Sequence, residues 1–311
     1  MNQTPNCGPD LPDPTAGRES RRVWDSFGRP TGRKIDAATL RDVTITIPVL
    51  NQAHYTRECL ETLRRAGIAD SQIVVVDNGS TDETPTLLAG SPELVVIRND
   101  TNRGCGGAWN QGVRARPANW TVVLNNDVLA PPGWLEGLVD FAEREHFDIV
   151  SPAMFEGDAD YDFPRYAIEF MERMGRVKRP GVASGACFMV HRRVFEKVGL
   201  FDDDLRLGGY EDDEFFRRCR KAGFRVGTTG GSFLHHFGSI TQKAMKAALK
   251  KPKASLGDRE YYRKKYHLTW LKRHVWRLRR SLQGTWWRWT ELALHGRTLS
   301  VRRLNGVFQW R

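Results

Sequence analysis

Cysteine is scarce in this sequence, and a long apolar run is missing from it. The five cysteines are scattered, odd in number and without a CxxC pair, which argues against a disulfide framework or a zinc site and favours a reducing compartment. No stretch approaches the roughly 18 uninterrupted apolar residues of a membrane span. The N-terminus, with Asp10 and Asp13 among prolines, is unlike a signal peptide. We therefore expect a cytoplasmic protein, soluble or peripheral at the inner face of the cytoplasmic membrane.

Two glycine-rich nucleotide signatures are missing as well. The segment Gly104-Cys105-Gly106-Gly107 is separated from its strand by the loop 98–103, and position 109 holds no glycine. The P-loop pattern is absent. We therefore discount both a dinucleotide-binding turn and a P-loop.

Acidic residues are scarce in one part of the chain only. Residues 241–311 hold 19 Lys and Arg against 3 Asp and Glu, whereas the other 240 residues hold 29 against 34. The formal net charge of +11 therefore comes from the C-terminal region.

Strands alternate with helices from residue 43 onward. The expected strands are 43–50, 73–76, 94–97 and 121–124, and the expected helices are 55–66, 84–88 and 108–115. This alternation predicts an α/β fold with a mostly parallel sheet flanked by helices. Ligands of such sheets bind beyond the carboxyl ends of the strands, where Asp77 and Asp127 stand.

A second block of elements follows at 182–240. It combines a small-residue turn and a strand at 182–190 with helices at 193–198 and 211–222. We divide the chain into an N-terminal arm (1–42), a catalytic domain (43–240) and a basic, Trp-rich helical extension (241–311). The catalytic domain has a nucleotide-binding half (43–128) and an acceptor or catalytic half (129–240).

Four polar groups are candidates for chemistry. Asn125-Asn126-Asp127 suits a divalent metal that also binds phosphate oxygens, or a simple turn. Asp77-Asn78-Gly79-Ser80 suits a nucleoside, or a capped turn. The acids 211–214 suit a general base, or a solvated helix start. His235-His236 suits a metal ligand, or packed histidine.

Taken together, these segments resemble family 2 glycosyltransferases with the GT-A fold, over residues 43–240. The strings that carry the resemblance are TIPVLNQ (46–52), VVVDNGSTDET (74–84), NRGCGGAWNQG (102–112), VVLNNDV (122–128), SGACFMVHR (184–192), GLFDDDLRLGGYEDDEFFRRCRKAGFRV (199–226) and HHFGS (235–239). Their order and spacing are most similar to bacterial members that build or decorate surface polysaccharides, including rhamnosyltransferase-like ones.

The resemblance implies a nucleotide-diphosphate sugar donor, most simply a UDP- or dTDP-sugar. The nucleotide-binding residues that it implies are Pro48, Asn51, Asp77, Asn78, Arg98, Asn102, Gly107 and Asn126. The donor-sugar and acceptor residues are Ser184, Gly185, Ala186 and Arg218. Asn125 stands where the family often has the first acid of an Asp-x-Asp motif.

The resemblance also implies an inverting, metal-assisted mechanism. Asp127 and His236, preferred over His235, would bind Mg²⁺ or Mn²⁺. In the acidic pair Glu211-Asp212, Asp212 would deprotonate a hydroxyl of a glycan or lipid-linked glycan acceptor.

The extension 241–311 lies outside the resemblance and holds six tryptophans among its basic residues. This composition suits an anionic membrane surface. Packing on the catalytic domain, a homodimer contact and nucleic acid are the alternatives, although we expect no specific nucleic acid.

Two rival functions follow. One is a catalytically inactive scaffold that binds membrane or nucleic acid through the tail. The other is a nucleotidyltransferase, which TIPVLNQ disfavours because it lacks a Gly-rich basic loop.

Overall fold

The computed structural model describes residues 35–205, 209–241, 256–304 and 307–310. Residues 1–34 of the expected N-terminal arm lie outside this range. The remainder of the arm forms α2 (Ala37–Arg41), in which the Asp36 side chain accepts a hydrogen bond from the Ala38 N–H. This contact is a helix N-cap.

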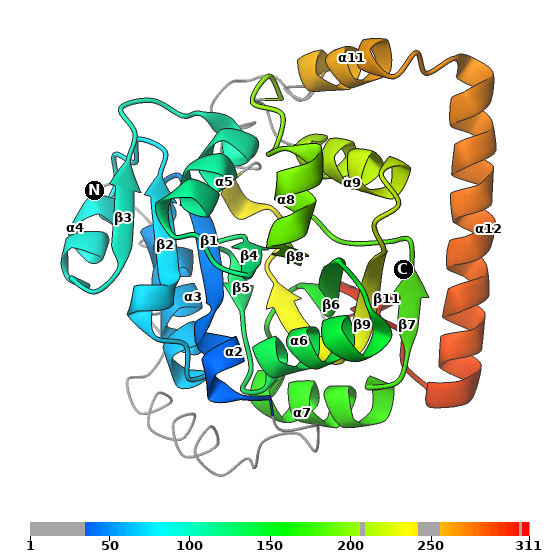
Figure 1. The fold of residues 1–311 in the computed structure, drawn as a ribbon. Coiled ribbons are helices and arrows are strands. Elements are labelled where there is room, and N and C mark those ends of the chain that lie inside the picture. Colours follow the sequence, from blue (N-terminus) through cyan, green and yellow to red (C-terminus); the bar gives the residue numbers. More distant parts are fainter. Residues whose placement is uncertain (1–34, 206–208, 242–255, 305–306, 311) are drawn as a thin grey trace, which may run out of the picture.

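The first half of the sheet is parallel, as the alternation of elements predicts. Its four strands lie in the order β3 (Val95–Arg98), β2 (Ile73–Asp77), β1 (Val43–Val49) and β4 (Trp120–Leu124). Every residue of β1, β2 and β4 is buried, because helices cover both faces (Figure 1). These helices are α3 (Ala53–Arg65), α4 (Thr84–Ala89) and α5 (Gly104–Ala115).

The second half of the sheet is mixed. β8 (Cys187–His191) lies antiparallel between β4 and β6 (Ile149–Gly157). β9 (Val226–His236) runs parallel to β6 and antiparallel to the short strands β5 (Val128–Leu129) and β7 (Lys178–Pro180). The helices of this half are α6 (Trp134–Glu145), α7 (Phe163–Met174), α8 (Arg192–Val198) and α9 (Glu211–Lys221).

The tail is helical, as expected, but it also contributes strands to the sheet. After α11 (Leu256–Lys265) and α12 (Trp270–His295), the chain forms β10 (Ser300–Leu304) and β11 (Val307–Trp310). β10 pairs parallel with β6, and β11 closes that edge. This pairing was not predicted from the sequence.

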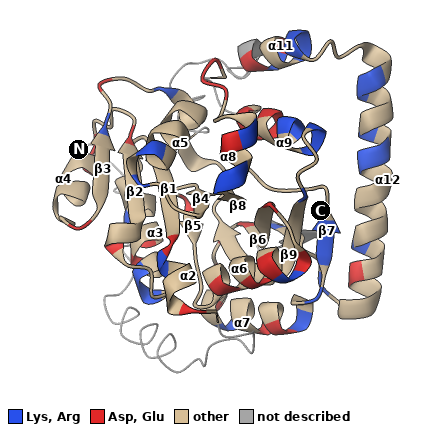
Figure 2. Cartoon of the chain, in the orientation of Figure 1, with Lys and Arg blue, Asp and Glu red and all other residues tan. Residues whose placement is uncertain are grey.

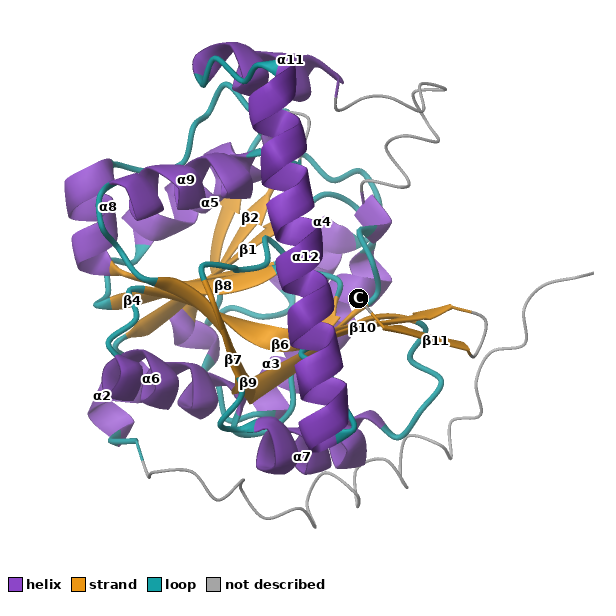
Figure 3. Ribbon diagram, turned by 90° about the vertical axis from the view of Figure 1, so that its right-hand side faces the viewer, coloured by secondary structure: helices purple, strands orange, loops and turns teal. Residues whose placement is uncertain are grey.

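The long helix α12 lies along the outside of the molecule (Figures 1 and 3). At its C-terminal end the buried Glu291 accepts two hydrogen bonds from Arg179 of β7, both at 2.8 Å. Thr298 also donates to Glu291. Within the part of the chain that the structure describes, no helix is both long and apolar enough to cross a bilayer.

Candidate active site

The carboxyl end of β2 forms a closed polar corner. Asp77 is buried, and its two carboxylate oxygens accept from the Ser80 N–H at 2.8 Å and from Arg98 Nη1 at 2.9 Å. Asn51 has a positive φ of 56°, and its side-chain oxygen accepts from the Thr81 N–H at 2.8 Å. Both side chains therefore hold the loop 78–82 in place, while half of the Arg98 side chain stays exposed.

A second set of amides connects β2 to the start of α5. Asn78 donates to the Gly104 carbonyl at 3.2 Å and accepts from Asn99 at 3.0 Å. Asn102 accepts from the Gly104 N–H at 2.8 Å. Gly107 lies one turn into α5, close to the Arg103 side chain. The predicted nucleotide residues of β2 and α5 thus lie in one region.

The remaining two predicted nucleotide residues occupy buried framework positions. Pro48 stands in β1, opposite Val76 of β2. Asn126 is buried and donates to the Thr56 hydroxyl of α3 at 2.9 Å. The structure therefore gives the Asn126 amide a partner within the chain.

Asp127 and His236 come together through the pairing of β5 with β9. The register sets Val128 opposite His236, so that the Asp127 carboxylate lies 3.2 Å from His236 Nε2. Its other oxygen accepts from the Ile240 N–H at 3.0 Å. Burial alone would raise the pKa of Asp127, but the hydrogen bond and charge of His236, together with backbone hydrogen bonds that include the Ile240 N–H, hold that pKa below its ordinary value. Asp127 is therefore ionised at neutral pH.

His235 points to the opposite side of β9, as alternation along a strand requires. Its Nδ1 lies 2.9 Å from the Tyr161 hydroxyl, and its ring packs on Phe155 and Phe237. Burial lowers the pKa of His235 to about 4. It is therefore a neutral core histidine, and His236 is the imidazole that faces Asp127.

Asp212 lies in the first turn of α9, against the turn that precedes β8. A Cβ added at Gly185 would overlap the Asp212 carboxylate. The turn itself is fixed to β6, because the Ser184 N–H donates to the Ser151 hydroxyl at 2.8 Å. Burial, then the negative charges of Glu211 and Asp213, raise the pKa of Asp212 to about 7. This carboxylate can therefore exchange a proton near neutrality.

The two acidic sites share one end of the sheet. The Asn125 N–H donates to the Ala186 carbonyl at 2.9 Å, which joins the segment before Asp127 to the turn beside Asp212. Cys105, in the first turn of α5, is close enough to both acidic sites for their charges to affect its thiol. Burial, then the charges of Glu211, Asp212 and Asp127, raise the pKa of that thiol. Segments from four parts of the chain thus converge.

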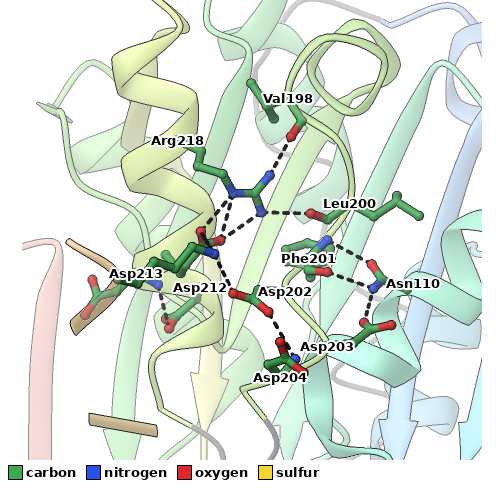
Figure 4. A network of polar contacts seen from close by, with 12 residues as sticks. Asn110, Val198, Leu200, Phe201, Asp202, Asp203, Asp204, Asp212, Asp213 and Arg218 are labelled. Atoms are coloured by element: carbon green, nitrogen blue, oxygen red, sulfur yellow. Dashed lines mark hydrogen bonds and ion pairs between the residues drawn. The ribbon is translucent and has the colours of Figure 1, made fainter. Parts of the chain in front are cut away.

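Glu211 and Arg218 hold α9 in position. Glu211 is buried and accepts from the backbone N–H groups of Gly209 and Tyr210, at 2.7 and 2.9 Å. Arg218 pairs with the buried Glu214 and donates to the carbonyls of Val198 and Leu200, at 2.6 and 2.7 Å (Figure 4). The structure thus places the guanidinium of Arg218 among groups of its own chain.

A second set of polar contacts, near Asp212, was not predicted from the sequence. Asn110 of α5 exchanges two hydrogen bonds with the backbone of Phe201, both at 2.9 Å (Figure 4). Asp202 accepts from Lys265 and Tyr261 of α11. A lone Asn inside a helical pattern could have signalled the first contact. Nothing local signals the second, since it joins distant segments.

Asp127 and His236 are the residues best placed to hold a divalent metal. Among the described residues, no group of three or more His, Cys, Asp or Glu side chains is arranged to hold a metal ion. One carboxylate and one imidazole fit a divalent cation whose other ligands are water and substrate phosphate oxygens. The donor set therefore fits a metal that arrives with a phosphorylated substrate.

Comparison with known proteins matches the family description "Glycosyl transferase family 2" to residues 44–199. The chain is 25% identical over 173 residues to an uncharacterised glycosyltransferase of Rickettsia prowazekii, covering 53% of this chain and 54% of that protein. It is 33% identical over 120 residues to the succinoglycan biosynthesis protein ExoO of Rhizobium meliloti, covering 35% of this chain and 34% of that protein. The chain thus spans about half, or less, of these curated relatives.

Among solved structures, the chain is similar to a mannosyltransferase from Pyrobaculum calidifontis in complex with GDP-Man and Mn²⁺. The TM-score is 0.51 at 19% identity, and the match covers 75% of this chain and 66% of that one. At this identity the likeness establishes the fold alone, and it confirms the predicted GT-A architecture.

Proposed function

The chain belongs to glycosyl transferase family 2, and from this membership we propose that it transfers a sugar from a nucleotide-diphosphate donor to an acceptor hydroxyl with inversion. The observation that carries the proposal is the convergence, at one end of the sheet, of an ionised Asp127 beside His236 and a carboxylate that titrates near neutrality, Asp212. The two carboxylates have different pKa values and therefore suit different tasks.

Asp212 is the proposed general base. Its carboxylate would take the proton of the acceptor hydroxyl while that oxygen attacks the anomeric carbon. The bond from the anomeric carbon to the diphosphate breaks in the same displacement, and its electron pair leaves with the diphosphate. A base poised near pH 7 suits this transfer. Gly185 keeps the space beside the carboxylate free of a side chain.

The nucleoside would bind at the corner formed by Asp77, Asn78 and Arg98. Asp77 lies at a strand end, where sheets of this kind bind nucleotides, and the half-exposed Arg98 side chain would contact a ribose or a diphosphate there. We propose a UDP- or dTDP-sugar as donor. The similar mannosyltransferase was solved with GDP-Man, so GDP-sugars belong in the test.

The diphosphate would be bound with a divalent cation held by Asp127 and His236. Such a cation neutralises the charge that develops on a departing diphosphate. Because the pair includes an imidazole nitrogen, which suits transition metals better than the oxygen-preferring Mg²⁺, we propose Mn²⁺ as the more effective ion. The acceptor would be a glycan or a lipid-linked glycan, in line with the succinoglycan relative.

The test is a thermal-shift and transfer assay with UDP-, dTDP- and GDP-sugars, each with Mn²⁺, with Mg²⁺ and without metal. We expect one nucleotide class to stabilise the wild type only with metal, and Asp127→Ala to lose this stabilisation. His236→Ala should need about tenfold more Mn²⁺ for the same effect. Asp140→Ala on α6, a partly exposed acid, is the control and should behave as wild type.

The anomeric configuration of the product, read by NMR, tests inversion. If no nucleotide sugar binds under any metal condition, the transferase proposal fails and the inactive scaffold takes its place. If donor binding is equal with and without metal, only the assignment of Asp127 and His236 fails.

A further inference from the structure

The outer face of α12 carries a continuous apolar stripe. The stripe consists of Leu271, Val275, Leu278, Leu282, Trp286 and Trp289. These residues are three or four positions apart, which places them on one side of a helix. All six are exposed, from 42% for Val275 to 70% for Trp289. At 1.5 Å per residue, the stripe is about 27 Å long.

The apolar stripe faces away from the protein body. The buried or half-buried positions of α12 are Arg273, Gly284, Trp287, Arg288, Thr290, Glu291, Leu292 and His295, and most of them lie on the opposite side of the helix. Glu291 is the one that pairs with Arg179. Soluble proteins seldom leave so long a row of large apolar side chains open to water. The stripe is therefore a candidate contact surface.

Positive charge flanks the apolar stripe along one side. α12 contains six Lys and Arg residues, and Lys272 and Arg279 border the stripe directly. Figure 2 shows Lys and Arg positions, in blue, along α12. Its one acid, Glu291, is buried and paired with Arg179, so no exposed acid of this helix offsets those cations. A partner for this surface must accept apolar side chains and supply negative charge.

We propose that the apolar stripe of α12 docks on the surface of an anionic lipid bilayer, with the helix lying in the plane of the interface. Leu and Trp side chains would enter the boundary between headgroups and acyl chains, while the Lys and Arg side chains contact the headgroups. A second copy of the chain fits less well, because it would bring two cationic helices together. Nucleic acid fits less well because four of the six stripe residues are Leu or Val, which cannot stack on bases.

The structure connects this surface to the candidate active site. α11, which precedes α12, holds Asp202 and Glu214 through Lys265, whose Nζ lies 2.5 and 2.8 Å from them. Glu214 belongs to α9, the helix that carries Asp212. Docking of α12 would thus hold the base beside the membrane, where a lipid-linked acceptor resides. This last step rests on the proposed function, whereas the docking itself does not.

The test is flotation of the full-length protein with vesicles of phosphatidylcholine alone or mixed with phosphatidylglycerol. We expect at least about tenfold more binding to the mixed vesicles. Leu278→Gln/Leu282→Gln should reduce that binding about tenfold or more. The matched control is Trp276→Gln/Leu294→Gln, which removes two exposed apolar side chains from another side of α12 and should stay within about threefold of wild type.

Asp212→Asn is tested in the same assay, so that vesicle binding is measured without transfer activity. Binding that is equal for both double variants, or absent for the wild type, would overturn the proposal. Two further outcomes would overturn it. One is a wild-type dimer, seen by analytical ultracentrifugation, that is lost in Leu278→Gln/Leu282→Gln while vesicle binding is unchanged. The other is wild-type retention on RNA that is lost in the same variant while vesicle binding is unchanged. If the protein binds vesicles but no nucleotide sugar, the docking proposal stands and only the proposed transferase function fails.

Discussion

Two regions of this molecule depart from the usual distribution of side chains, in opposite directions. The candidate active site buries acids: Asp77, Asp127, Glu211 and Glu214 are each at most 4% exposed. α12 does the reverse and exposes large apolar side chains, among them Trp286 at 69%. Charged residues are seldom fully buried without partners, and large apolar rows are seldom exposed.

The difference lies in how each region is compensated. Asp77, Glu211 and Glu214 have two or more hydrogen-bond partners from the chain, as described above, so their burial is offset locally. The apolar stripe of α12 has no comparable packing from the residues that the structure describes. We infer that the burial of Asp77, Glu211 and Glu214 is offset within the chain, whereas the stripe needs a surface from outside. The following predictions test that contrast.

The largest effect is expected at Asp212, the acid whose pKa is raised most clearly. Asp212→Asn removes the proposed base and should lower the transfer rate about 10³-fold. The wild-type rate should increase with pH through about 7 as Asp212 loses its proton. A variant that retains more than about a tenth of the wild-type rate would show that another group takes the proton.

The same substitution should change stability in a pH-dependent way. In the unfolded chain an aspartate loses its proton near pH 4, whereas folded Asp212 holds its proton to about pH 7. The unfolded chain therefore loses this proton first, and wild-type stability falls as the pH rises from about 4 to 7. Asp212→Asn should unfold at a higher temperature than wild type at pH 8 and gain nothing at pH 4. An equal shift at both pH values would contradict the raised pKa.

Gly185→Ala should have the next largest effect, because the new methyl group must displace the Asp212 carboxylate. Misplacing a catalytic group by about 1 Å costs about 100-fold in rate. The carboxylate can swing aside, so the melting temperature should change little. Gly284→Ala on α12, where an added Cβ meets open space, adds the same methyl group away from the site and should keep full activity. A wild-type transfer rate for Gly185→Ala would show that Asp212 is not the general base.

Much of the parallel half of the sheet could be predicted from the sequence, because parallel strands that are buried on both faces consist of continuous apolar runs. Val74, Val75 and Val76 illustrate this, and the alternation of strands and helices then set their order. The pairing of β10 with β6 could not be predicted. Its sequence, Ser300–Leu304, contains two arginines and no apolar run, and its partner lies far away in the chain.

Positions in the candidate site could be predicted where an acidic residue stands at the carboxyl end of an apolar strand, as at Asp77 and Asp127. The contact between Asp127 and His236 depends on the β5–β9 register, and only the fold supplies that register. The resemblance suggested Arg218 near the sugar, yet its guanidinium is occupied by Glu214 and two carbonyls. The two carbonyl partners of Arg218 could not be predicted from the sequence, because every residue has a backbone carbonyl and only the fold brings these two to the guanidinium.

A smaller effect is expected where the two regions meet, at Lys265. Lys265→Met removes one partner from the buried Glu214 and one from Asp202, and should lower the free energy of unfolding by about 1–2 kcal/mol. Lys264→Met is the control on the same helix. Its exposed ion pair with Glu260 should contribute less than about 0.5 kcal/mol. Equal urea midpoints for the two variants would show that α11 is not held at Glu214 in solution.

The smallest effect is expected at the apolar stripe itself. Leu278→Gln/Leu282→Gln changes side chains that are already more than 60% exposed, so it should alter the free energy of unfolding by less than about 0.5 kcal/mol without vesicles. Leu63→Ala, at a fully buried position of α3, should cost about 2–5 kcal/mol by comparison. A loss of 2 kcal/mol or more in the stripe variant would mean that these leucines are packed in solution against the chain or a second copy. The contrast between the two regions would then be wrong, because the stripe would already have its partner.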